Sequence, residues 1–154
     1  MLNPILPRHV DNTYHGSKVA LWLFAIVVFM KAGISLNSIF NGYIVATGPD
    51  GIPLDTFTPV SARAFVSLLA AWGLAQFMIC LLCILVLARY RALVPFMFGL
   101  LLVEHLSRRL IFLVMPIVRI GTPPGFFVNL ALVALMVVGL ALSLRRHDNL
   151  PTKE

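Results

Sequence analysis

Four ionisable side chains lie near the middle of an apolar stretch of the chain, GLLLVEHLSRRLIFLVMPIV, which covers residues 99–118. They are Glu104, His105, Arg108 and Arg109. A charged side chain in hydrocarbon costs about 2.5 kcal/mol or more, so such residues are usually paired and often mark a functional site. A carboxylate, an imidazole and two guanidinium groups can hold an anion, bind a hydrogen-bond acceptor or transfer protons. These residues are therefore the first candidates for the chemistry of this chain.

The composition places these residues in a membrane protein. Hydrophobic residues make up 60% of the 154 residues and charged residues only 12%, whereas a soluble domain is roughly half apolar and a quarter charged. The formal net charge is +6, but the Lys and Arg residues flank or enter apolar segments, so we expect no nucleic-acid partner. Four long apolar segments take up most of the chain. We therefore expect one integral membrane domain over residues 1–154, in contact with the lipid bilayer.

Each apolar segment reaches the roughly 20 residues that are needed to cross about 30 Å of hydrocarbon. The expected spans are residues 19–40, 64–88, 92–118 and 126–144, with an outer loop over residues 41–63. The segments TGPDGIP, RYR and GTPPG separate them, and they favour turns over a continued helix. The predicted fold class is all-α, a polytopic membrane protein with a bundle of four transmembrane helices.

The basic residues predict the orientation of this bundle. Seven of the twelve fall on one side, and the loops on the other side hold only Arg63 and Arg119. An excess of Lys and Arg marks the cytoplasmic side, so both termini are expected in the cytoplasm. The seven residues are Arg8, Lys18, Arg89, Arg91, Arg145, Arg146 and Lys153.

The depth of each polar residue in the bilayer can be counted from the cytoplasmic end of its span, since each residue of a helix rises 1.5 Å. Counted in this way, the polar residues fall into two layers. Lys31, Gln76 and Glu104 each lie roughly 18 Å from that side, close to the bilayer centre. Because isolated charges are costly at that depth, we predict that Lys31 and Glu104 approach each other. The second layer lies about one turn further out and contains Ser35, Trp72, Arg108 and Asn129.

The third span divides into a polar face and an apolar face. Glu104 and Arg108 are four residues apart and share one side of the helix, while His105 and Arg109 share the neighbouring side. Together these four side chains cover an arc of about 140°. We expect the opposite arc to face lipid. It holds Gly99, Val103, Leu106, Leu110, Val114 and Ile117.

The formal charges of the two layers do not balance. Lys31, Arg108 and Arg109 oppose the single negative charge of Glu104. Surplus positive charge in a low dielectric favours an anionic or strongly accepting group, such as a lipid headgroup, a carboxylate or a quinone carbonyl, although one Arg can instead reach outward to the interface. We therefore expect a polar centre that binds an amphipathic or anionic molecule, a quinone or a lipid. Its residues are Lys31, Ser35, Gln76, Glu104, His105, Arg108, Arg109 and Asn129.

Other interpretations of the same residues stay open. Polar residues between membrane helices can be structural contacts worth about 0.6 kcal/mol each. The chain could be a small proton- or ion-coupled transporter that titrates Glu104, or an assembly or chaperone-like protein that binds a membrane complex or further copies of itself. An enzyme is not expected. Adjacent residues such as Glu104 and His105 diverge by about 100° on a helix and do not converge on one substrate atom.

The cysteines and glycines inside the spans are expected to pack between helices. Cys80 and Cys83 lie among leucines, whereas redox motifs of this spacing normally start a helix with an exposed thiol. No metal site is expected, since these thiols lack further ligands at their depth and His9 and His15 have too few partners. Small residues allow helices to approach closely, and those inside spans are Gly33, Gly73, Gly99 and Gly139.

Four short motifs follow one another between residues 41 and 146. They are SARAFVSLLAAWGLA at the start of the second span, RYRALVP in the basic turn, EHLSRR within the third span and GTPP before the fourth. In this layout the chain resembles the DoxX-like superfamily of small bacterial four-helix membrane proteins. The resemblance implies a four-helix bundle in the bacterial inner (plasma) membrane. Some members are accessory subunits of quinone-linked oxidoreductase systems, which implies a similar accessory role here, and many have no assigned role. The family supplies no catalytic residues to carry over.

Overall fold

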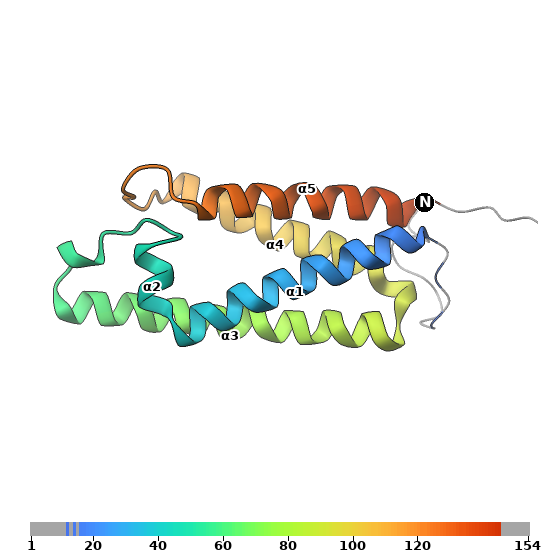
Figure 1. The fold of residues 1–154 in the computed structure, drawn as a ribbon, viewed down its shortest axis with the longest axis horizontal. Coiled ribbons are helices and arrows are strands. Elements are labelled where there is room, and N and C mark those ends of the chain that lie inside the picture. Colours follow the sequence, from blue (N-terminus) through green and yellow to red (C-terminus); the bar gives the residue numbers. More distant parts are fainter. Residues whose placement is uncertain (1–11, 13, 15, 146–154) are drawn as a thin grey trace, which may run out of the picture.

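Four long helices lie side by side in the part of the chain that the structure, a computed structural model, describes: residues 12, 14 and 16–145 (Figure 1). They are α1 (Lys18–Phe40), α3 (Pro59–Arg89), α4 (Val94–Val114) and α5 (Gly125–Leu144). Shorter helices connect them: α2 (Gly42–Thr47), η1 (Leu54–Thr56) and η2 (Arg91–Leu93). The fold is all-helical, as predicted. Arg8, His9, His15, Arg146 and Lys153 lie outside the described residues.

Three of the long helices, α1, α3 and α5, are long and apolar enough to cross a membrane. The 21 residues of α4 match them in length, but this helix carries Glu104, Arg108 and Arg109. Large apolar side chains cover the outside of the bundle, including Trp22 and Phe29, each 70% exposed. Such a surface is suited to lipid and not to water.

The helix boundaries differ from the sequence prediction at the expected outer loop, residues 41–63. The first helix breaks at Asn41 (φ −125°, ψ 34°) and resumes as α2, so part of this loop is helical. The next helix begins at Pro59, five residues before the predicted start. The Thr58 hydroxyl accepts a hydrogen bond from the Ser61 N–H at 3.2 Å, and Pro59 fits the first helical position because its missing N–H needs no partner there.

The third span was predicted to end at Val118, but α4 ends at Val114. Pro116 explains the early end. The residue before a proline is disfavoured in helical conformation, and Met115 has φ −121° and ψ 77°. At its other end the predicted span began at Ala92, where the chain instead forms the short helix η2.

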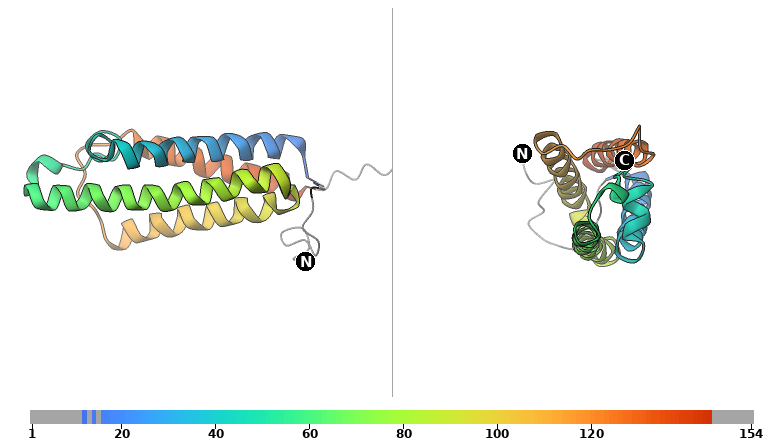
Figure 2. Two further views of the ribbon diagram at one scale, coloured as in Figure 1. Left: turned by 90° about the horizontal axis from the view of Figure 1, so that it is seen from below. Right: turned by 90° about the vertical axis from the view of Figure 1, so that its left-hand side faces the viewer.

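The helices pack unevenly around the bundle. The largest interface joins α1 to α3, and α5 packs on both α1 and α4. In contrast, α3 and α4 contact each other little. Figure 2 shows the reason: α4 starts beside the end of α3 and then diverges from it toward the α2 end of the bundle.

Two apolar clusters form the core, one in each half of the bundle. The larger one joins all four long helices and includes Phe24 of α1, Cys83 of α3, Phe98 of α4 and Met136 of α5, all fully buried. The smaller one lies at the α2 end and contains Ala46, Ile52 and Leu54, with Phe65, Val66, Leu69 and Ile117 packed against it. Both cysteines are free and buried.

Two of the four glycines within the spans lie at helix contacts. A Cβ at Gly73 would come within 3.0 Å of the Ser35 carbonyl oxygen, and a Cβ at Gly139 would overlap the Phe98 ring. The expectation was wrong for Gly33 and Gly99, since a Cβ at either position meets no atom within 4 Å. Spacing within a span does not show which side of a helix faces a neighbour.

The two long connections pack against each other at the α2 end. The Ile120 N–H donates to the Gly51 carbonyl at 2.8 Å, and the Gly125 N–H donates to the Pro49 carbonyl at 3.0 Å. Gly51 has φ 65°, a conformation that side-chain-bearing residues rarely adopt. These bonds hold Asp50 against the start of α5. Both described ends of the chain lie at the opposite end of the bundle, where the Ser17 N–H donates to the Leu142 carbonyl at 3.4 Å.

Asp50 makes the stability of this loop contact depend on pH. Burial raises the pKa of its carboxyl group, and Arg119 and Arg108 offset part of that rise. Such a carboxyl binds its proton more tightly in the folded protein, so the free energy of unfolding falls as the pH rises from 3.8 through the raised pKa. We expect Asp50→Asn to flatten this fall, as measured by the midpoint of detergent-induced unfolding between about pH 4 and pH 7. Asp55→Asn, at an exposed position, is the control. An unchanged pH profile in Asp50→Asn would contradict the assignment.

Candidate functional site

Lys31 and Glu104 form an ion pair between α1 and α4, as predicted. The Lys31 Nζ donates to the Glu104 Oε2 at 2.8 Å. The Lys31 side chain is 4% exposed, while that of Glu104 is 22% exposed. A buried ammonium group is tolerated when it is paired, and this pair joins two helices that otherwise share few contacts.

Arg108 lies one turn along α4 from Glu104 and makes three contacts. One guanidinium nitrogen is 3.7 Å from the Glu104 Oε1, and another is 3.0 Å from the His105 Nδ1. The guanidinium carbon also lies 4.7 Å from the centroid of the Trp72 ring on α3, within the range of a cation–π interaction. Since a guanidinium group only donates, the His105 Nδ1 accepts, and the imidazole is neutral with its proton on Nε2.

Gln76 of α3 belongs to the same layer as the ion pair. Gly73 packs against the Ser35 backbone of α1, and the two helices run in opposite directions. Gln76 follows Gly73 by three residues and Lys31 precedes Ser35 by four, so Gln76 and Lys31 lie at nearly the same height. The Gln76 side chain is buried, and its Nε2 has no hydrogen-bond partner among the described residues.

Ser35 is fully buried one turn from Lys31, but its hydroxyl serves the helix itself. It donates to the Lys31 carbonyl oxygen at 2.7 Å. This bond occupies its only donor, so Ser35 offers the polar centre a small side chain and lone pairs only. Its main structural role is the close approach of Gly73.

Two predicted residues remain. Asn129 lies on α5, and Arg109 lies on α4 with its side chain toward α5. Gly139 of α5 packs on Phe98 of α4, and counting ten residues from each along these opposed helices brings Asn129 level with Arg108. The Asn129 side chain is half-buried. The guanidinium carbon of Arg109 lies 5.3 Å from the Phe126 ring centroid, away from the ion pair.

Hydrogen-bond donors exceed acceptors in the polar centre. The Lys31 ammonium has three N–H groups, the Gln76 amide two and the Arg108 guanidinium five. Each of these nitrogens can donate hydrogen bonds but cannot accept them. The nearby acceptors are the Glu104 carboxylate, the His105 Nδ1, the Gln76 Oε1 and the lone pairs of the Ser35 hydroxyl. On the helices, Lys31 and Arg108 carry two positive charges against the one negative charge of Glu104, and the loop residue Asp50 is the only other carboxylate that acts on Arg108 among the described residues. The arrangement is therefore suited to a group that carries oxygen acceptors or negative charge.

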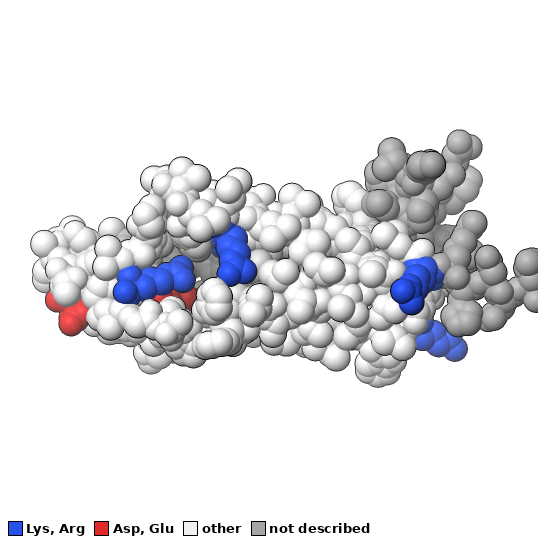
Figure 3. Space-filling model, turned by 90° about the horizontal axis from the view of Figure 1, so that it is seen from above, with Lys and Arg blue, Asp and Glu red and all other residues white. Residues whose placement is uncertain are grey.

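The polar centre is open on one side. The side chains of Glu104 and Arg108 are 22% and 23% exposed, although both lie midway along the bundle. Both lie on α4, which diverges from α3 toward the α2 end of the bundle (Figure 2). On the face drawn in Figure 3, basic atoms gather over the half nearer the loops, with acidic atoms visible between them. An uncharged stretch separates this group from the basic atoms at the opposite end.

Sequence reasoning placed Trp72 in the outer polar layer but missed its contact with Arg108. Depth could be counted from the sequence, whereas the direction of the indole ring depends on how α3 is rotated. The electrostatic effect of Arg108 on the carboxyl group of the loop residue Asp50 was also missed. Asp50 comes near only because the two long connections pair through backbone hydrogen bonds. In the described ranges no group of three or more His, Cys, Asp or Glu could hold a metal ion.

A comparison of the chain with models of protein families, with curated proteins and with solved structures finds no match. The class of this protein is therefore inferred from its structure alone. In its described part the chain is all-helical, its apolar helices suit a membrane, and its bundle contains a paired polar centre. Lipid is the environment that its exposed apolar side chains fit.

Proposed function

We propose that this chain is a four-span inner-membrane protein whose polar centre binds an amphipathic molecule with oxygen acceptors. The ligand class is an anionic lipid-like or quinone-like molecule, and the protein serves as an accessory component of a membrane redox assembly. The chain supplies binding and orientation in this role and no catalytic residue.

The pairing of charges supports α4 as a membrane span in addition to α1, α3 and α5. Its 21 residues equal about 31 Å of helix, enough to cross the hydrocarbon. Glu104 is paired with Lys31, and Arg108 is held by Glu104, His105 and Trp72. Pairing of this kind is what makes charged residues tolerable in a membrane helix. The opposite arc fits lipid, since Val103, Leu106, Leu110 and Val114 are 48% to 74% exposed.

The distribution of charge supports a cytoplasmic location for both termini. Lys18, Arg89, Arg91 and Arg145 lie at the end of the bundle where the described chain begins and ends. The opposite end carries Arg63 and Arg119 with both loop aspartates, Asp50 and Asp55. This asymmetry follows the excess of Lys and Arg on cytoplasmic sides.

The observation that carries the binding proposal is the donor surplus of a partly exposed centre. If the polar residues were only contacts between helices, their donors and acceptors should satisfy one another. Instead, the buried Gln76 amide has an unused donor, and the Arg108 guanidinium is 23% exposed between diverging helices. A ligand headgroup that enters from the lipid between α3 and α4 supplies the missing acceptors. The resemblance of the chain to DoxX-like proteins favours a quinone carbonyl or an acidic headgroup for this role.

Trp72 provides a direct test of binding because it lies on Arg108. The chain has two tryptophans, so Trp22→Phe leaves Trp72 as the only one. We expect a nitroxide-labelled fatty acid, and separately a short-chain quinone, to quench Trp72 fluorescence with saturation. Arg108→Leu should weaken the apparent affinity by about tenfold, since a hydrogen bond to a charged group is worth about 1.5–3 kcal/mol.

The control is Arg109→Leu, which removes the neighbouring guanidinium that lies over Phe126. It should leave the affinity for both probes unchanged. A second control uses the methyl ester of the labelled fatty acid, which carries no negative charge. It measures the part of the quenching that does not depend on the carboxylate. Quenching that does not saturate, or that is identical in Arg108→Leu, would show that the polar centre is a structural contact and no binding site.

A further inference from the structure

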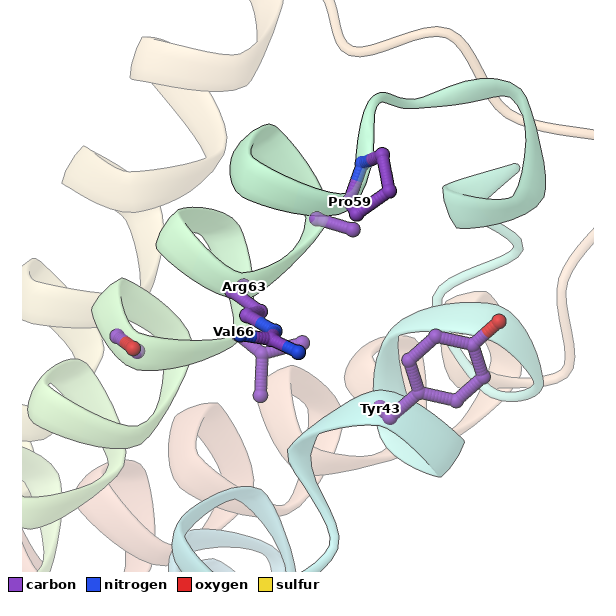
Figure 4. A pocket seen from close by; sticks show the side chains of 6 residues that line it. Tyr43, Pro59, Arg63 and Val66 are labelled. Carbon is purple, nitrogen blue, oxygen red and sulfur yellow. The ribbon is translucent and has the colours of Figure 1, made fainter.

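A groove lies between α2 and α3 at the loop end of the bundle, apart from the polar centre. Its volume is about 480 Å³, within the range of about 300–1,000 Å³ that is usual for small-molecule sites. Figure 4 shows Tyr43 on the α2 side and Pro59, Arg63 and Val66 on α3. The groove is lined by Tyr43, Pro59, Ala62, Arg63, Val66 and Ser67.

The polar groups of this groove have no partners of their own in the described part of the chain. Arg63 takes part in neither of the two ion pairs that join described residues, Lys31–Glu104 and Arg108–Glu104. Ser67 is one turn further along α3 on the same side of the helix as Arg63. Arg63 and Ser67 can both donate hydrogen bonds, the Tyr43 hydroxyl points away from Arg63 (Figure 4), and no carboxylate lines the groove. This set of donors is complementary to a phosphate group.

The position of Arg63 along α3 matches the boundary between hydrocarbon and headgroups. Residues 64–88 of this helix carry no charge, and Arg63 directly precedes them. The 31 residues of α3 give a length of about 46 Å, longer than the hydrocarbon by roughly 16 Å. Arg and Tyr are characteristic of this interface. Beyond the groove, Leu74 follows Ser67 by seven residues on the same side of α3, and it is 49% exposed and available to an acyl chain.

We propose that this groove binds an anionic phospholipid, with the headgroup phosphate on Arg63 and Ser67 and an acyl chain along Val66 and Leu74. The α2 helix forms the second wall, and the close contact of Gly42 with Val66 fixes its distance from α3. A Cβ at Gly42 would come within 3.1 Å of a Val66 methyl group, so a larger residue at position 42 would push α2 away from α3. The site holds a lipid at the loop end of the bundle and is separate from the ligand of the polar centre.

The test is native mass spectrometry of the full chain released from nanodiscs that contain phosphatidylcholine and phosphatidylglycerol. We expect the wild type to retain phosphatidylglycerol in excess of its share of the nanodisc. Arg63→Gln should reduce this retention by about tenfold, and Arg63→Lys should reduce it less, since charge remains but the bidentate contact is lost. Arg119→Gln is the matched control, because it removes the other basic residue at this end of the bundle and should leave the retention unchanged.

Two outcomes would overturn the proposal. Equal retention of phosphatidylglycerol by wild type and Arg63→Gln would show that the groove does not hold the lipid. Displacement of the lipid by inorganic phosphate at millimolar concentration would show a site for the free anion instead. Arg63 is exposed, so its variants should fold, and an unchanged helical circular dichroism spectrum checks this. Ser67→Ala should also lower the retention, although Arg63 is kept.

Discussion

Glu104→Leu is expected to lower the free energy of unfolding by about 3–5 kcal/mol, the cost of removing one partner of a buried ion pair. Lys31 is 4% exposed and bonds to Glu104 at 2.8 Å, so the variant leaves an ammonium group in an apolar surrounding. To reach water, the Lys31 side chain would have to move out of the helix bundle. This movement would disrupt the contact of α1 with α4. The measurement is reversible unfolding in mixed micelles, followed by circular dichroism.

The reverse substitution should cost less. In Lys31→Met the Glu104 carboxylate keeps Arg108 at 3.7 Å and is 22% exposed, so we expect a loss of about 1–2 kcal/mol. The double variant should recover about 2 kcal/mol or more relative to Glu104→Leu, because apolar replacement of both partners is often neutral. Equal losses in the two single variants, with no recovery in the double variant, would show that the pair does not act as a unit.

Gly139→Leu is expected to destabilise the bundle by about 3 kcal/mol, at the upper end of the cost of overpacking a core. A Cβ at Gly139 overlaps the ring of Phe98, which is fully buried. Phe98 cannot turn away easily, because it packs edge-on against Phe24 with ring centroids 4.9 Å apart. The side chain must therefore push α5 from α4, and unfolding in mixed micelles measures the loss.

Gly99→Ala is the matched control on α4. A Cβ there meets no atom within 4 Å, so the variant should gain up to about 1 kcal/mol from the better helix propensity of alanine. A similar loss in Gly99→Ala and Gly139→Leu would mean that glycine matters for helix flexibility. A loss confined to Gly139 would instead confirm that it serves close packing between α4 and α5.

Composition and periodicity determined the coarse architecture of this protein. Long apolar segments separated by Pro- and Gly-rich turns predicted an all-helical membrane protein, and the described part of the chain agrees. Depth counting predicted the meeting of Lys31 and Glu104 from opposite halves of the sequence. Both predictions rest on local rules: the rise per residue of a helix is constant, and the cost of an isolated charge in hydrocarbon requires a partner at the same depth.

Only the tertiary structure decided how each helix is rotated and where the connections lie. The contact of Arg108 with Trp72, the different surroundings of Gly139 and Gly99, and the groove beside Arg63 all depend on it. Depth along a helix follows from residue number alone. Rotation and tilt follow from how all the side chains of two helices interlock, and no single segment of sequence contains that information.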